Sequence, residues 1–278
     1  MTSTFSATKY GQEIGNGQLP TNSVRALRVA RDGSVWVGFG GPGGVTRLSR
    51  GTVRNFSPTD GLPGALITSL LEDRDGTIWA GSLNGLYRLQ GERWQDVSHT
   101  AGLRVQVVDA LFEDSRGDLW VATSAGVFRR PPQTGRFEPI TPLRIESMTE
   151  DAQGRVWGTG ADALLVILTD PTPQPVTSAN SVMLRAGHRL VRDADNNLWI
   201  ATLGDGLLRV LAEDGQTQIE RFAQNSSLSS EVVRSVLRDR EGNLWVGTQN
   251  GLDRLSRGVV RSLPGDEDAM SRLVRAVA

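Results

Sequence analysis

One seven-residue pattern recurs six times along the chain: an acidic residue, then glycine or asparagine three positions later, then tryptophan three positions after that. The copies are Asp73-Gly76-Trp79, Asp114-Gly117-Trp120, Asp151-Gly154-Trp157, Asp193-Asn196-Trp199, Asp239-Gly242-Trp245 and a weakened Ala30-Gly33-Trp36. Successive tryptophans are 43, 41, 37, 42 and 46 residues apart. This spacing is the period of a β-propeller blade and is too long for leucine-rich repeats or helical hairpins.

The second repeat shows how each copy divides into strands. Short apolar runs at 67–72, 77–81, 86–89 and 93–97 are separated by turn signals, of which Gly76 and the Asn84-Gly85 pair are the clearest. The chain is therefore predicted to be all-β, a single β-propeller domain (1–278) of four-stranded antiparallel blades. The expected blades cover about 20–57, 62–98, 103–141, 142–178, 184–223 and 228–264.

The two chain ends predict the flanks of a seventh blade. Val274-Arg-Ala-Val277 is similar to Val24-Arg-Ala-Leu27, where the first repeat begins, and residues 4–10 precede the first repeat as a last strand would. Residues 4–10 and 273–278 are thus expected to be strands of a further blade. Either the termini close that blade, or the chain is a piece of a longer array, which we favour. An open seam would leave unpaired strand edges and promote self-association.

Composition excludes several classes of function. The formal net charge of −1 provides no basic surface for nucleic acid or anionic membranes. The absence of cysteine excludes thiolate metal sites and a cysteine nucleophile. No apolar run is long enough to span a membrane, and the start, MTSTFSATKY, lacks the pattern of a signal peptide. We expect no cofactor and no metal.

Residues that repeat in most blades are expected to be structural. The tryptophans are predicted to pack between neighbouring blades, and the motif aspartates to accept backbone N–H groups in a turn. A calcium site at Asp73-Arg-Asp-Gly76 is disfavoured because the loop supplies too few oxygens. Five arginines in a G-[LV]-x-R pattern are predicted to form hydrogen bonds between blades: Arg47, Arg88, Arg129, Arg209 and Arg254.

Candidate ligand residues are those that vary between otherwise matching blades. Near the start of the innermost strand, each repeat carries a polar residue: Arg25, Thr68, Asp109, Glu146, His188 and Arg234. These side chains could surround the central channel and bind hydroxyl or carboxylate groups, or simply form its solvated lining. In the fifth repeat, Arg189 replaces a small residue and Gly187 an apolar one, which adds Arg189 to the candidates. The fourth repeat also departs from the pattern, through degeneration or because it holds a site.

Two blades carry a recognisable longer motif. Ile78-Trp-Ala-Gly-Ser82 with Gly85-Leu-Tyr-Arg88, and Leu244-Trp-Val-Gly-Thr248 with Gly251-Leu-Asp-Arg254, resemble two-component regulator propeller repeats. The resemblance covers about residues 20–262. It implies a periplasmic or other extracytoplasmic sensor region of a bacterial hybrid histidine kinase or diguanylate cyclase. In that family the propeller is a sensory input, responding in several cases to oligosaccharides.

The resemblance favours a non-enzymatic propeller that binds a sugar or small anionic metabolite. One alternative is a protein-interaction scaffold that docks a partner or a further receptor domain. The other is a propeller hydrolase or lyase, since the D-x-G-x-x-W boxes of sialidases are similar turn motifs. Those enzymes use a tyrosine nucleophile. Tyr10 and Tyr87 are the only tyrosines here, and Tyr87 aligns with apolar or unrelated residues in other repeats.

Overall fold

A computed structural model defines most of the chain. It describes residues 19–62, 64, 66–100, 103, 107–160, 165–173, 175–176, 187–193, 195–213, 216–223 and 228–256. Two compact units divide it, Met1–Leu143 and Arg144–Ala278, and each is described by itself. The expectation of one domain stays a prediction, and the predicted seventh-blade strands at 4–10 and 273–278 lie outside the described residues. Within the described part, no helix is long and apolar enough to cross a membrane.

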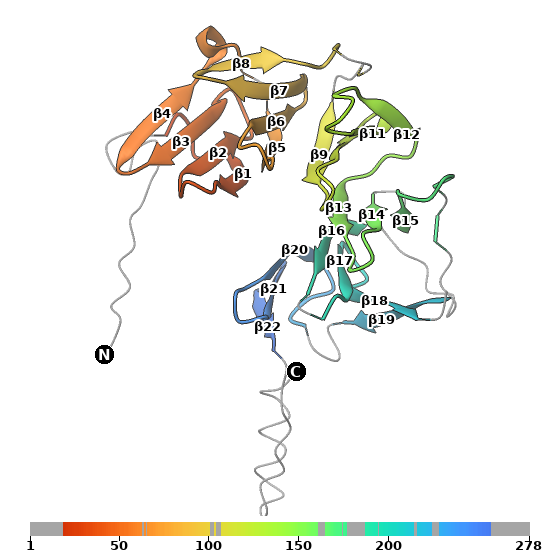
Figure 1. Ribbon diagram of the computed structural model, residues 1–278. Helices are drawn as coiled ribbons and strands as arrows, with labels where there is room; N and C mark the ends of the chain where they lie inside the picture. The colour runs from red at the N-terminus through yellow and green to blue at the C-terminus, as the bar shows by residue number, and fades with distance from the viewer. Residues whose placement is uncertain are drawn as a thin grey trace, which may run out of the picture. The chain divides into compact units, whose positions relative to one another are not determined.

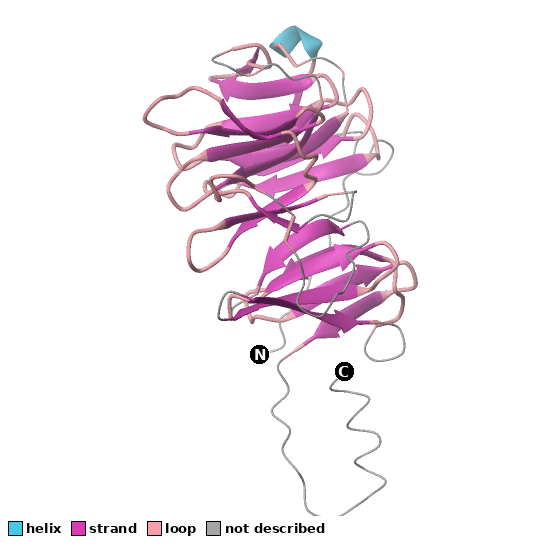
Figure 2. Ribbon diagram, turned by 90° about the vertical axis from the view of Figure 1, so that its right-hand side faces the viewer, coloured by secondary structure: helices cyan, strands magenta, loops and turns pink. Residues whose placement is uncertain are grey.

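The first unit contains three antiparallel sheets of four strands each, in which every strand pairs with the next along the chain (Figure 1). The first sheet has β1 (Val24–Val29), β2 (Val35–Phe39), β3 (Val45–Ser49) and β4 (Thr52–Phe56). The second has β5 (Ile67–Glu72), β6 (Ile78–Ser82), β7 (Gly85–Gln90) and β8 (Arg93–Asp96). The third has β9 (Val108–Glu113), β10 (Leu119–Thr123), β11 (Gly126–Arg130) and β12 (Glu138–Thr141). A single 3₁₀ turn, η1 (Pro58–Asp60), is the only helix in the described residues (Figure 2).

The second unit repeats this arrangement. Its sheets are β13 (Ser147–Glu150), β14 (Val156–Thr159) and β15 (Leu165–Ile167); then β16 (Gly187–Arg192), β17 (Leu198–Thr202), β18 (Leu207–Glu213) and β19 (Gln216–Phe222); then β20 (Val233–Arg238), β21 (Leu244–Thr248) and β22 (Leu252–Leu255). The outer strand predicted near Val260 and Leu263 lies outside the described residues. The predicted fold class is confirmed: the chain is all-β, with six β-propeller blades, three in each unit.

The motif aspartate organises the turn between the first two strands of a blade. In the second blade, Oδ1 of Asp73 accepts the backbone N–H groups of Asp75 (3.0 Å) and Thr77 (2.8 Å), and Oδ2 accepts the indole N–H of Trp79 (2.8 Å). Gly76 has a φ of 84°, a conformation that favours glycine. The predicted turn role is confirmed. The indole bond, which explains why tryptophan follows six residues later, also occurs at Asp114, Asp151, Asp193 and Asp239.

The first blade lacks this aspartate and satisfies its tryptophan differently. The indole N–H of Trp36 donates to Oγ of Ser34 (3.0 Å), and that hydroxyl donates in turn to Asp32 (2.6 Å). Ala30 occupies the usual acidic position and is buried. A serine–aspartate pair therefore replaces the single carboxylate.

This substitution predicts a compensating pair of mutations. Ser34→Ala leaves the buried indole N–H of Trp36 without an acceptor, so it should lower the free energy of unfolding by about 1 kcal/mol. Adding Ala30→Asp should recover most of that loss by restoring the acceptor used in the other blades. Urea titrations of the wild type, the single variant and the double variant measure both effects. A double variant less stable than Ser34→Ala would contradict this account.

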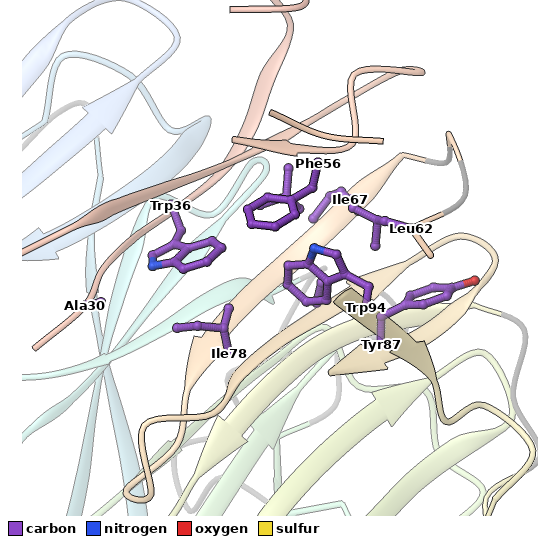
Figure 3. Close-up of a cluster of buried hydrophobic side chains, with 10 residues drawn as sticks. Ala30, Trp36, Phe56, Leu62, Ile67, Ile78, Tyr87 and Trp94 are labelled. Carbon is purple, nitrogen blue, oxygen red and sulfur yellow. The ribbon is translucent and has the colours of Figure 1, made fainter. Parts of the chain in front are cut away.

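The motif tryptophans pack between neighbouring blades, as predicted. Trp36 contacts the second blade, where its ring lies 6.3 Å from that of Trp94 in an edge-to-face arrangement, and Ile78 belongs to the same cluster (Figure 3). Trp79, Trp157 and Trp199 each join a cluster with apolar residues of the following blade. Burial of large aromatic surface thus holds consecutive blades together within each unit.

The prediction for the G-[LV]-x-R arginines is wrong in its main point. All five arginines lie directly across the strand pair from the tryptophan of their own blade, and in four of them the guanidinium group covers its ring. The distances to the ring centroid are 5.6 Å for Arg47, 5.9 Å for Arg129, 5.8 Å for Arg209 and 5.9 Å for Arg254. Arg88 instead bonds Gln95 of the same blade. Among the contacts between described residues, only Arg47 of this set reaches the next blade, through Glu92 (3.2 Å). A residue can therefore repeat in most blades because of a contact inside the blade.

Candidate functional site

The first strands of neighbouring blades lie side by side in each unit. In the first unit β5 lies next to both β1 and β9, and in the second β16 lies next to both β13 and β20 (Figure 1). Equivalent positions on these strands are therefore neighbours in space. The candidate ligand residues occupy one such position.

That position is a β-bulge. The pairing of each first strand with its second strand shifts by one residue between Val24 and Ala26, Ile67 and Ser69, Val108 and Ala110, Gly187 and Arg189, and Val233 and Ser235. The residues inside these shifts are Arg25, Thr68, Asp109, His188 and Arg234. In the fourth blade, Glu146 directly precedes β13, and its backbone N–H donates to Thr159 (2.8 Å). An extra residue in one strand of a pair leaves the ladder and its side chain is redirected, a device common beside binding sites.

The bulge residues differ in what they offer a ligand. Arg25 and Arg234 are exposed, whereas Asp109 and Glu146 are half-buried. The hydroxyl of Thr68 donates to the carbonyl oxygen of Val108 on the neighbouring first strand (2.6 Å). Thr68 therefore links two blades, and the exposed arginines are the better donors to a ligand.

The structure describes the side chain of only one residue of the basic pair His188-Arg189 predicted in the fifth blade. His188 lies at the bulge of β16, but its side chain lies outside the described residues. Arg189 pairs with Ala201 in the ladder and is exposed. Other blades carry alanine or serine at the position of Arg189. In the second and sixth blades a glycine lies across from that serine with little space, because a Cβ on Gly81 or Gly247 would come within 2.4 Å of the serine hydroxyl. The fifth blade thus has a cationic side chain where these two blades have close packing.

Tyr87 has the environment of a core residue. Its ring is buried with Trp94 and Leu62, and its hydroxyl donates to the carbonyl oxygen of Asn84 (3.3 Å). Burial, followed by the nearby Asp96 charge, raises the pKa of Tyr87 to about 12. Because a nucleophilic tyrosine must lose its proton readily, this environment favours a structural role.

Sequence reasoning identified the position but missed the bulge. A signal was present: in five blades the polar residue stands between an apolar residue and alanine or serine, as in Ile67-Thr68-Ser69 and Val233-Arg234-Ser235. Two consecutive residues that break a strict alternation are typical of a bulge. Among the described residues, no group of three or more His, Asp or Glu could hold a metal ion.

The sequence matches a known repeat family in three places. The family model for the two component regulator propeller matches residues 61–84, 102–125 and 227–250. Each segment covers the first strand, the motif turn and the second strand of one blade: β5 and β6, β9 and β10, and β20 and β21. No curated protein matches the chain.

Solved structures share the fold at low sequence identity. The extracellular domain of a one-component system from B. thetaiotaomicron is 20% identical, with a TM-score of 0.56 over 85% of this chain and 40% of its own. PorZ of the type-IX secretion system of Porphyromonas gingivalis is 19% identical, with a TM-score of 0.65 over 87% and 40%. A catalytically inactive virginiamycin B lyase from Staphylococcus aureus, solved with quinupristin, is 15% identical, with a TM-score of 0.65 over 89% and 84%. The chain spans about 40% of the length of the first two.

Proposed function

We propose that this chain, which carries two component regulator propeller repeats, is the non-enzymatic, ligand-sensing propeller of a bacterial signal-transduction receptor. Its ligand would be a sugar or a small anionic metabolite, bound where the bulges of the first strands present polar side chains. The structurally similar extracellular domain supports an extracytoplasmic location, periplasmic or at the cell surface. Output would come from other parts of the receptor.

The recurrent bulge is the observation that carries this proposal. A β-bulge interrupts regular pairing, so its repetition in consecutive blades keeps one redirected side chain per blade on the same side of the unit. The residue at this position changes between consecutive blades, whereas the motif tryptophan is present in all six repeats and the turn aspartate in five of them. A constant scaffold with a variable row of polar groups is the usual organisation of a binding surface.

Charge favours an anion or a hydroxyl-rich molecule as the ligand. Arg234 and Arg189 are exposed on the first strands of the second unit, and Arg25 is exposed on that of the first unit. Guanidinium groups donate several hydrogen bonds in a fixed geometry, which suits carboxylates and vicinal hydroxyls.

A thermal-shift screen with glycans and small anionic metabolites tests this function. A ligand that binds only the folded chain raises its Tm. Once a ligand is found, Arg234→Ala should weaken it by roughly 1 to 3 kcal/mol, the value of a charge-assisted hydrogen bond, without changing the Tm of the free chain. Titration calorimetry measures the affinity, with Arg93→Ala as control, because Arg93 is also exposed but lies on the outer strand β8.

Three results would contradict the proposal. Equal losses of affinity in the Arg234 and Arg93 variants would place the ligand elsewhere. Conversion of the ligand to a product, seen by mass spectrometry, would favour a lyase or hydrolase. A screen without any stabilising ligand would favour the interaction scaffold.

A further inference from the structure

A polar cavity of about 270 Å³ lies between the fourth and fifth blades of the second unit, away from the bulges. The β13–β14 turn forms one wall and the β16–β17 turn, with the end of β18, forms the other. The lining residues that matter here are Ala152, Arg155, Asn196, Leu198, Val210 and Leu211. The equivalent junctions in the first unit show which side chain normally fills this space.

In the first unit an arginine fills the equivalent space. Arg74, at the position of Ala152, donates to the carbonyl oxygens of Asp114 (3.1 Å) and Ser115 (3.0 Å) in the next blade. Its guanidinium lies against Gly117, where a Cβ would approach within 2.4 Å. Asn196 stands at the position of Gly117, and its own φ is 67°. The fourth blade therefore lacks the arginine, and the fifth blade carries a side chain where that arginine would lie.

The same junction also lacks a carboxylate. The backbone N–H of Arg31 donates to Glu72 (2.8 Å), and that of Arg74 donates to Glu113 (3.0 Å), each at the end of the next blade's first strand. The equivalent residue of the fifth blade is Arg192, which is exposed. Across the described part of the chain, the N–H of Ala152 accordingly has no carboxylate acceptor.

The guanidinium group of Arg155 is fixed at the cavity wall by Asp151 and Trp157. Arg155 donates from Nε to Oδ2 of Asp151 (2.6 Å), and its guanidinium lies 5.3 Å from the ring centroid of Trp157. Although burial opposes its ionisation, hydrogen bonds from Trp157 and Arg155 lower the pKa of Asp151, so this carboxylate stays charged at neutral pH. The fourth blade has Val166 in place of the G-[LV]-x-R arginine that covers the tryptophan ring in other blades. Arg155 covers Trp157 instead.

The remaining donors of Arg155 are unused within the described residues. Its backbone N–H and Nε both bond Asp151, and no acceptor there takes a hydrogen from Nη1 or Nη2. Buried or half-buried donors gain most from a charged acceptor, and a guanidinium fork matches the two oxygens of a carboxylate. Leu198, Val210 and Leu211 supply apolar surface on the other side.

We propose that this cavity binds a small aliphatic carboxylate. The carboxylate accepts hydrogen bonds from Nη1 and Nη2 of Arg155 and from the N–H of Ala152, in the role that Glu72 and Glu113 have at the other junctions. Its short carbon chain packs against Leu198, Val210 and Leu211. The volume, slightly below that of typical ligand pockets, limits the ligand to a few carbon atoms.

Titrations with sodium butyrate and sodium acetate, monitored by ¹⁵N–¹H NMR, test this site at constant ionic strength. Butyrate should shift the Ala152 amide and the Arg155 Nε–H resonances, and bind more tightly than acetate because its chain reaches the apolar wall. Sodium chloride and sodium phosphate serve as control salts whose anions are not aliphatic carboxylates. Equal shifts with all four salts would show general screening of charge and overturn the proposal, as would no shift with butyrate.

Two variants separate binding from folding. Arg192→Glu places a carboxylate where Glu72 and Glu113 stand, so it should compete for the Ala152 N–H and weaken butyrate roughly tenfold, with the Tm unchanged or raised. Arg155→Lys keeps the charge but loses the fork, and should weaken butyrate by a similar factor. Arg116→Ala is the matched control, because Arg116 also pairs with a motif aspartate, Asp114, at the surface of the first unit. Unchanged butyrate affinity in both Arg192→Glu and Arg155→Lys would refute the site.

Discussion

Replacing Trp199 with alanine should lower the free energy of unfolding of the chain by about 3 to 5 kcal/mol, the range of large-to-small changes in a core. Trp199 is only 7% exposed and packs with Leu244 and Val246 of the following blade. Its ring also contacts Phe222 at 5.2 Å, and its indole N–H bonds Asp193 (2.8 Å). The variant therefore loses a junction between two blades as well as a buried hydrogen bond.

Trp245 is the matched control for this prediction. It has the same motif hydrogen bond, to Asp239 (2.8 Å), and the same covering arginine, but it is only half-buried. Trp245→Ala should therefore cost clearly less than Trp199→Ala, because less apolar surface is lost. Urea unfolding followed by circular dichroism measures both variants. Equal losses would show that the motif tryptophans act mainly through their own turns and not through packing between blades.

Asp73→Ala should be the second most damaging change, lowering the free energy of unfolding by roughly 2 to 4 kcal/mol. One carboxylate accepts three hydrogen bonds, from the N–H groups of Asp75 and Thr77 and from the indole of Trp79. Trp79 is 3% exposed, so water cannot replace the lost acceptor at the indole. The cost of an unmatched buried donor exceeds the value of the bond itself.

Two further variants identify the source of this loss. Asp73→Asn retains one oxygen acceptor and should fall between the wild type and Asp73→Ala. Asp75→Ala changes an exposed residue of the same turn and should alter the free energy of unfolding by less than about 0.5 kcal/mol. The same urea titrations apply. If Asp75→Ala proved as harmful as Asp73→Ala, the turn would depend on its overall charge and not on the acceptor geometry of Asp73.

Features that depend on neighbours in sequence were predictable. The turn of Asp73 is made by residues two, four and six positions away, so its glycine, its aspartate and its tryptophan appear in the sequence as a fixed spacing. Alternation of apolar residues likewise indicated the strands, and the repeat period indicated blades. The prediction for Arg129 and Arg209 failed because spacing alone does not say whether a repeated side chain faces its own blade or the next.

The candidate sites were also predictable only where they depend on local sequence. The row of variable polar residues that includes Arg25 and Arg234 could be found by aligning the repeats. That each stands in a β-bulge depends on the pairing register with the second strand, which only the folded sheet decides. The cavity beside Arg155 depends on Ala152 and Arg192, which are 40 residues apart in sequence and belong to different blades. The blades could be predicted from the sequence because their turns are held by hydrogen bonds between residues close in sequence. The position of the cavity and of the unused hydrogen-bond donors of Arg155 depends on packing between blades, which only the tertiary structure decides.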